Sequence, residues 1–288
     1  MGTASVQIHE IETPDPGLYP DVPHAVYRGW RAASQTVLKI MRDRSPAHAL
    51  EYMLHPPEPT PALLLGAAVH TAVLQPDLFR QLYARAPEAD RRTKAGREAW
   101  EAVEAEHPEA TILRPEEYDL CIAIRDSVYA HPAARKLLRG QTEVSAVWRD
   151  PWHGVLCKGR FDVIPDGLGV IADMKTARDA SPGAFSRTVY ANGLYIQGAM
   201  YLMGGRALGL DVDLFAIVAV EKEPPYAVAV YNVRGEALAA GEEELGRLLE
   251  TWARCMETGN WPGYPDKAVD ITLPPWAWRQ VEERVESA

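Results

Sequence analysis

Three period-two segments follow one another between Thr142 and Thr176, and they limit what the chain can fold into. They read TEVSAVWRD, GVLCKGRFDVIP and LGVIADMKT. Such alternation is typical of β-strands, and the Pro-Asp-Gly before the last segment favours a turn. A helical stretch from about Ala184 to Leu208 follows, and VDLFAIVAVE and YAVAVYNV come next as two further strand-like segments. The second half of the chain is therefore expected to form a β-sheet.

The first half has a helical pattern instead. Ser34 is placed as an N-cap before apolar residues at helical spacing, and the apolar stretch from Pro61 to Leu74 predicts a helix that ends at Gln75-Pro76. Residues 88–140 are also expected to be mainly helical. Helices followed by strands predict an α/β fold of the α+β kind, in which helices flank a mixed β-sheet.

The length of 288 residues allows one large domain or two small ones, and we expect one domain over residues 1–288. Its expected parts are an irregular N-terminus over 1–25, a mainly helical portion over 26–140 that carries His70, a sheet core over 141–260, and an irregular tail over 261–288 that packs back on the body.

The composition is that of an ordinary globular protein, with 47% hydrophobic and 24% charged residues. Since no apolar run approaches the roughly 18 residues of a membrane span, and the N-terminus has neither a basic start nor an apolar segment, we expect no membrane contact and a cytoplasmic protein. A net charge of -10 disfavours nonspecific coating of nucleic acid, although a focused basic groove is compatible with it.

The three cysteines, Cys121, Cys157 and Cys255, lie far apart and have no CxxC partner. An odd number of separated cysteines indicates neither a disulfide framework nor a zinc or iron–sulfur cluster. They are expected to be buried thiols.

Charged residues flank the Pro-Asp-Gly turn and give the first sign of chemistry. Residues two apart on a strand share a face, so Asp173 and Lys175 point the same way. If Pro165 to Leu168 form the turn, Asp162 lies beside Ile171 and diagonal to Asp173. Two carboxylates with an ammonium alongside suit a hard cation and a nucleophilic water. On these residues alone, a solvated hairpin is an open alternative.

Four other polar side chains are candidates for the same site. His70, in the apolar stretch LGAAVHTAVL, is either a metal ligand or a core histidine with a buried hydrogen-bond partner. Gln197 and Tyr201 are four residues apart on the expected helix and share a face, which ordinary packing also explains. Glu143 opens the first strand, where a solvated edge is the alternative.

The order of these elements resembles the PD-(D/E)xK nucleases. The chain contains Gly-x-x-x-His, then Glu, Gly-Arg-x-Asp, Asp-x-Lys and Gln-x-x-x-Tyr. It resembles the RecB-like branch and, more closely, the exonuclease VIII (RecE)-like group with its lambda-exonuclease relatives. The stretches SQTVLKIMRDRSPAHALEYM, LLLGAAVHTAVLQPDLF, KGRFDVIPDGLGVIADMKTA and VEKEPPYAVAVYNV also look like that group, so the likeness spans roughly residues 26–260. It implies a restriction-endonuclease-like core.

The resemblance implies a site with one or two Mg²⁺ or Mn²⁺ ions. Its implied ligands are His70, Asp162, Asp173 and the backbone carbonyl of Met174, with Glu143 near a second ion. Lys175 would orient or activate the attacking water, and Gln197 and Tyr201 would hold the scissile phosphate or the lysine. Because clustered thiolates are lacking, the relatives that carry an iron–sulfur cluster are a poor match.

The resemblance also implies contacts with DNA. YRGWRAAS is similar to the segment that receives a 5′ phosphate in lambda-exonuclease relatives, which suggests Arg28 or Arg31 with Ser34, although an N-cap explains Ser34 equally well. The basic candidates for the phosphate backbone are Arg28, Arg31, Lys39, Lys158, Arg160 and Arg178, each of which is otherwise an ordinary surface charge.

By this likeness the protein would be a divalent-metal-dependent DNA exonuclease that resects linear double-stranded DNA 5′ to 3′ in recombination or repair. It would work with a single-strand annealing protein and form a homo-oligomeric ring of three or four subunits. Three alternatives stay open: a structure-specific endonuclease, a catalytically silent nucleic-acid-binding scaffold, and a hydrolase of smaller phosphate esters, which the long helical portion disfavours.

Overall fold

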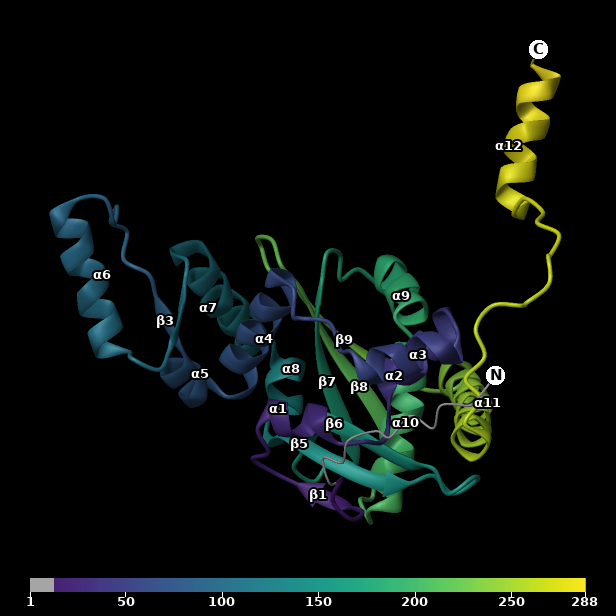
Figure 1. Cartoon of the computed structure of the whole chain (residues 1–288). Coiled ribbons are helices and arrows are strands. Elements are labelled where there is room, and N and C mark those ends of the chain that lie inside the picture. Colours follow the sequence, from purple (N-terminus) through teal and green to yellow (C-terminus); the bar gives the residue numbers. More distant parts are fainter. Residues whose placement is uncertain (1–12, 288) are drawn as a thin grey trace.

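A seven-stranded mixed sheet lies at the centre of the computed structural model, which describes residues 13–287 (Figure 1). Its order is β1-β5-β6-β7-β8-β9, and β2 also pairs with β6. Neighbouring strands are antiparallel except in the parallel pairs β7–β8 and β2–β6. The strands are β1 (Gly17–Tyr19), β2 (Ala33–Ser34), β5 (Gly140–Arg149), β6 (Leu156–Pro165), β7 (Val170–Ala177), β8 (Leu214–Glu221) and β9 (Val228–Val233).

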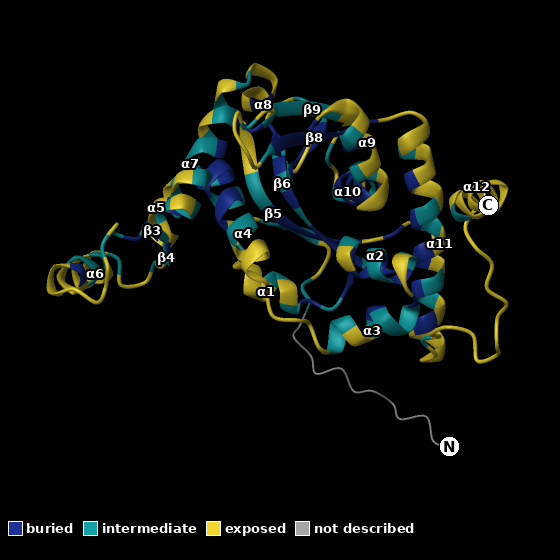
Figure 2. Cartoon of the chain, turned by 90° about the horizontal axis from the view of Figure 1, so that it is seen from above, coloured by how far each residue is buried: buried dark blue, intermediate teal, exposed yellow. Residues whose placement is uncertain are grey.

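Helices cover both faces of the sheet, so the mixed α/β fold expected from the sequence is confirmed (Figure 2). One apolar cluster joins the sheet to α4 (Pro61–Leu74), α7 (Pro115–Ala130) and α8 (Pro132–Leu137). The other joins it to α2 (Gln35–Asp43), α3 (Pro46–Leu54), α9 (Pro182–Ala191), α10 (Leu194–Ala207) and α11 (Glu236–Thr258). Two separate apolar cores thus hold the sheet from opposite sides.

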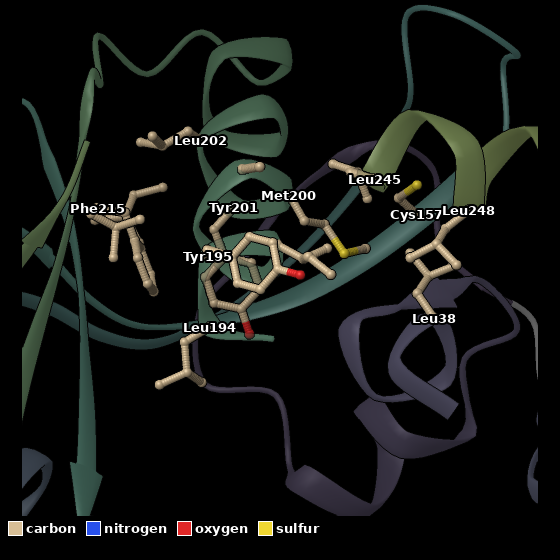
Figure 3. Close-up of a cluster of buried hydrophobic side chains, with 14 of the residues drawn as sticks. Leu38, Cys157, Leu194, Tyr195, Met200, Tyr201, Leu202, Phe215, Leu245 and Leu248 are labelled. Atoms are coloured by element: carbon tan, nitrogen blue, oxygen red, sulfur yellow. The ribbon is translucent and has the colours of Figure 1, made fainter. Parts of the chain in front are cut away.

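Helix α10 packs closely on the sheet because glycines line part of its surface. Its buried side chains lie among residues from the sheet, α2 and α11 (Figure 3). A Cβ atom at Gly204 would lie 2.7 Å from ring atoms of Trp148, and one at Gly198 would lie 2.7 Å from Phe215. Since a side chain at either position would collide with a buried ring, the glycines set the distance between helix and sheet.

Local signals in the sequence fix several helix starts. The hydroxyl of Ser34 accepts a hydrogen bond from the backbone N–H of Val37 and caps α2, as predicted. Thr60 caps α4 in the same way, and a proline occupies the first helical position. Helix α4 spans Pro61–Leu74, the range expected from its apolar run.

Two parts of the molecule extend from this body (Figure 1). The first is an arm built from α5 (Pro76–Leu82), β3 (Tyr83–Arg85), α6 (Lys94–Glu106) and β4 (Thr111–Leu113), in which β3 and β4 form a two-stranded parallel sheet. The second is α12 (Pro275–Glu286), which has no buried residue and lies away from the sheet. Within the described residues, no helix is long and apolar enough to cross a membrane.

Both ends of the chain are more regular than expected. The N-terminal 25 residues were expected to be irregular, yet β1 pairs with β5 and α1 spans His24–Gly29; residues 1–12 lie outside the described part. The tail after residue 260 was expected to be irregular and to pack back on the body. Instead it ends in α12, which begins with Pro275 at its first helical position, where the fixed φ angle of proline suits a helix start.

The turn between β6 and β7 also differs from the expectation. The strands bridge at Val163 and Ala172, and Pro165 is still part of β6, paired with Gly140. The turn therefore occupies residues 166–169 instead of Pro165 to Leu168. Gly167 and Gly169 have positive φ angles of 65° and 63°, a conformation that lets the chain reverse after the proline instead of at it. Asp162 consequently lies level with Asp173 and not with Ile171.

Candidate metal centre

Three carboxylates lie in a row across β5, β6 and β7. Thr142 pairs with Val163 and Val144 with Phe161, which puts the intervening Glu143 level with Asp162. The bridge between Val163 and Ala172 brings Asp162 level with Asp173. Residues that lie opposite each other on neighbouring strands are close enough to share a ligand.

The sheet opens at Asp162, and its side chain takes the place of a backbone group. Oδ2 of Asp162 accepts a hydrogen bond of 2.8 Å from the backbone N–H of Met174. In an extended strand the N–H and C=O of one residue point to the same neighbouring strand. The Met174 carbonyl therefore faces β6 as well, on the side of Asp162.

His70 approaches the row from the helix that covers it. His70, Glu143 and Asp162 each offer one ligand atom, and these three atoms lie within 4.8 Å of one another. Nδ1 of His70 is 3.6 Å from Oδ2 of Asp162, too far for a hydrogen bond. Two carboxylates and an imidazole at this spacing can hold a hard divalent cation, and clustered thiolates are missing among the described residues of the site.

Asp173 is engaged by two other expected site residues. Its Oδ1 accepts a hydrogen bond of 2.6 Å from Nε2 of Gln197, which lies on α10. Nζ of Lys175 is 2.5 Å from Oδ2, an ion pair without an aligned hydrogen bond. Asp173 thus lies beside the group of three and joins it to the lysine.

The charges of the site change one another's protonation. Burial and the neighbouring Asp173 raise the pKa of Asp162 well above its usual range. Burial opposes the ammonium form of Lys175, yet Asp173 and Asp162 raise its pKa above the usual value. Burial and Lys175 lower the pKa of His70, so its imidazole is the neutral form that ligates metals.

Tyr201 lies in the core cluster of Figure 3, one helical turn after Gln197. Its ring packs edge-on against Phe161, with ring centroids 5.0 Å apart. Burial raises the pKa of the Tyr201 hydroxyl well above its usual value, and the nearby Tyr27 raises it further. The hydroxyl therefore stays protonated. Its expected role of holding the phosphate or the lysine stays a prediction.

The basic residues expected to contact DNA fall into two groups. Nζ of Lys158 is buried and donates hydrogen bonds to the backbone carbonyls of Tyr27, Arg28 and Trp30 at 2.7–3.1 Å. Lys158 therefore anchors the end of α1. The prediction that it contacts DNA at the surface is wrong, because its ammonium is engaged inside the protein. Arg160 also donates hydrogen bonds to groups of its own chain, the Glu143 carboxylate and the Val22 carbonyl. Arg28 and Arg178, in contrast, are exposed and can reach a ligand.

The expected 5′-phosphate pocket has a local structural role as well. Ser34 is buried and its hydroxyl caps α2, the simpler of the two explanations for this residue. Nη1 of Arg31 donates a hydrogen bond to the backbone carbonyl of Met53. Lys39 forms an ion pair with Asp43 on the same helix. A phosphate contact by Arg28, Arg31 or Ser34 stays a prediction.

Comparison with known families agrees with this geometry. Residues 34–272 match the model of a family described as a PDDEXK-like domain of unknown function (DUF3799). The chain belongs to this family. The predicted PD-(D/E)xK superfamily is thereby confirmed, and nucleases of this PDDEXK-like kind use divalent metals. The assignment of the chain to the RecE-like branch stays a prediction.

A solved structure shows the same fold. The crystal structure from Eubacterium rectale named "Putative exonuclease" aligns with 86% of this chain and 92% of its own, with a TM-score of 0.53 and 15% sequence identity. At this identity the likeness concerns the fold alone. A search among curated proteins finds no match.

Sequence reasoning missed two features of this PDDEXK-like site. It treated Lys158 and Arg160 as DNA contacts, although both bind groups inside the chain. Alternation along β6 does contain a signal, because Lys158, Arg160 and Asp162 are two residues apart and Asp162 points inward. Two basic residues that share a strand face with a largely buried carboxylate are as good candidates for structural partners as for surface charges.

Proposed function

We propose that the protein is a divalent-metal-dependent DNA exonuclease. The observation that supports this most is the convergence of His70, Glu143 and Asp162 within 4.8 Å, next to the ion pair of Asp173 and Lys175. A catalytically silent scaffold would have no need to keep the partly buried ammonium of Lys175 beside clustered carboxylates, because removing such charges from water is costly. Membership of the PDDEXK-like family supports the same reading.

The residues of the site have distinct roles in this proposal. His70, Glu143, Asp162, Asp173 and the Met174 carbonyl would hold one or two Mg²⁺ or Mn²⁺ ions. Such a cation, when bound, stabilises the charge that builds up on the phosphate oxygens and makes water a better nucleophile.

The remaining polar groups orient the reactants. The Lys175 ammonium would position the attacking water, as its ion pair with Asp173 holds it beside the carboxylates. Gln197 fixes the Asp173 carboxylate through the hydrogen bond to Oδ1. Gln197 and the Tyr201 hydroxyl would also hold the scissile phosphate or the lysine. Arg28, Arg31, Ser34 and Arg178 are the proposed contacts to DNA.

The finer features of the proposal come from the exonuclease VIII (RecE)-like resemblance. We propose 5′ to 3′ resection of linear double-stranded DNA in recombination or repair, in the cytoplasm, together with a single-strand annealing protein. A homo-oligomeric ring of three or four subunits is part of the same proposal. The structural neighbour of similar fold carries the name "Putative exonuclease", which agrees with this proposal.

Digestion of DNA labelled separately at its 5′ and 3′ ends tests the proposal. Linear duplex and closed circular DNA are incubated with the protein and Mg²⁺, Mn²⁺ or EDTA. The expected result is metal-dependent loss of the linear duplex alone, with the 5′ label released first. Release of the 3′ label first would overturn the polarity, and nicking of the circle would make the protein an endonuclease. No cleavage in any metal would favour the silent scaffold.

A further inference from the structure

We infer that Arg160 is a positioning residue that holds Glu143 at the metal centre and is not a contact to DNA. The inference rests on the proposed function, because it concerns a ligand of the proposed metal site. Arg160 lies on β6, two residues before Asp162, so it reaches the centre from the strand that supplies a central ligand.

The contacts of Arg160 point inward. Its Nε donates a hydrogen bond of 2.5 Å to Oε2 of Glu143, and Nη1 donates one of 2.9 Å to the backbone carbonyl of Val22. The side chains of Arg160 and Glu143 are only 15% and 18% exposed. A guanidinium held at two nitrogens by groups of its own chain has little freedom to follow a DNA backbone.

Glu143 needs such a partner because its backbone is strained. Its φ angle of 54° places a residue with a full side chain in the left-handed region, inside a strand. Strain of this kind persists only where surrounding contacts hold it, and it is concentrated at functional sites. The ion pair with Arg160 is such a contact. It engages Oε2 of Glu143, a residue whose carboxylate lies within 4.8 Å of ligand atoms of His70 and Asp162.

The arrangement matches the way proteins orient metal ligands. A ligating carboxylate is usually hydrogen-bonded by a neighbouring group, and loss of that group typically weakens metal binding about 10- to 100-fold. The Val22 carbonyl fixes the far side of the guanidinium, so the position of the ligand depends on the segment before α1. Arg160 thus connects the N-terminal segment to the metal centre.

Binding of Mn²⁺ measured by titration calorimetry, without DNA, tests the inference. Arg160→Gln is expected to weaken Mn²⁺ binding about tenfold or more. Arg160→Lys should restore little, since an ammonium cannot reproduce the two-sided hold of a guanidinium, although a lysine serves well as a phosphate contact. Arg247→Gln is the matched control, because Arg247 pairs with Glu243 on the exposed face of α11 and its loss should leave Mn²⁺ affinity unchanged.

A double-mutant cycle tests whether Arg160 acts through Glu143, and duplex binding checks that the rest of the protein is intact. If Arg160 acts through Glu143, then Arg160→Gln should add nothing to the Mn²⁺ defect of Glu143→Gln. Binding of a labelled duplex in EDTA, followed by fluorescence anisotropy, should change less than about threefold in Arg160→Gln if the loss is confined to the metal centre.

The outcomes that overturn the inference are distinct from those that overturn the function. Unchanged or tighter Mn²⁺ binding in Arg160→Gln, full rescue by lysine, or additive losses in the cycle would reject the positioning role. Weaker duplex binding with normal Mn²⁺ binding would make Arg160 a DNA contact. If the unsubstituted protein binds no Mn²⁺, the metal centre itself is rejected, and the proposed function and this inference fall together.

Discussion

The ammonium of Lys175 lies beside Asp173 and within the field of Asp162, and cleavage should depend on it more than metal binding does. We expect Lys175→Met to lower the single-turnover cleavage rate by about 10²- to 10⁴-fold, the usual contribution of a group that moves or orients a proton. Mn²⁺ binding should be kept, since the substitution removes a positive charge from the centre. A rate within tenfold of the unsubstituted protein would exclude Lys175 from the reaction.

The raised pKa of Asp162 predicts how metal binding and stability respond to pH. Since the folded protein keeps the proton on Asp162 to higher pH than the unfolded chain does, the metal-free protein should lose stability as pH rises from the ordinary carboxyl pKa through the raised value. Mn²⁺ must displace that proton, so its affinity should rise over the same range.

Asp162→Asn checks both trends against the unsubstituted protein. Asparagine keeps an oxygen that can accept the Met174 N–H but cannot ionise. Thermal unfolding in EDTA and Mn²⁺ calorimetry, each between pH 5 and 8, should therefore show a more stable metal-free protein with a flatter pH dependence and weak Mn²⁺ binding at every pH. A pH dependence that persists in Asp162→Asn would assign it to another group.

Individual site residues could be predicted where a titratable side chain is unusual for its surroundings, as in a strand or an apolar helix. Asp162 and His70 stand out in apolar surroundings, and the structure places Nδ1 of His70 3.6 Å from Oδ2 of Asp162. The partner of Glu143 could not be predicted, because nothing local in the sequence reveals a left-handed backbone at a glutamate. The role of Lys158 was missed since its three carbonyl acceptors lie about 130 positions earlier.

At the scale of elements, period and capping signals were enough to find the strands of the second half and several helix ends. The register of β6 and β7 was missed by two residues, because Pro165 was taken as part of the turn although it ends the strand. A proline at a strand end and glycines with positive φ at positions 167 and 169 together set this turn. The pairing of β2 with β6 was also unforeseen, as two residues give no periodic signal.

The close contact between α10 and the sheet predicts opposite effects for two glycine substitutions in helices. Gly204→Ala should destabilise the protein by about 1–3 kcal/mol, because its Cβ would lie 2.7 Å from the Trp148 ring. Gly246→Ala, in α11 with no atom within 4 Å of the added Cβ, should stabilise by about 0.5–1 kcal/mol. Urea unfolding of both variants measures this, and a stabilised Gly204→Ala would show that α10 can move off the sheet.

At the scale of the molecule, the C-terminal tail should be removable as far back as Pro265 without loss of stability, but not as far back as Gly259. Trp261 packs on Trp252, and the Pro262 carbonyl accepts a hydrogen bond from Ala47, whereas α12 has no buried residue. A chain that stops after Pro265 should keep its melting temperature. One that stops after Gly259 should melt several degrees lower, since about 1 kcal/mol corresponds to about 2–4 °C at this size.

Thermal unfolding of the two truncated chains measures the difference. Equal melting temperatures for both would show that the Trp261 contact contributes nothing, and a loss in the longer chain would mean that α12 supports the body.

The sequence allowed the layered body to be predicted, because amphipathic patterns report which face of an element is buried. It could not reveal the arm or the detached α12, whose residues give the same helical patterns without saying what they pack against.

The arm also limits how far the chain can be shortened. Its two strands are parallel, with Tyr83 opposite Thr111 and Arg85 opposite Leu113, so the end of β3 and the start of β4 lie at opposite ends of the pair. Parallel strands cannot be joined by a tight turn and need a crossover of about a dozen residues or more, which α6 and its flanking loops supply here. A connection between residues 87 and 110 that is cut well below this length should separate β3 from β4, whereas the carboxylate row on β5, β6 and β7 should stay unchanged.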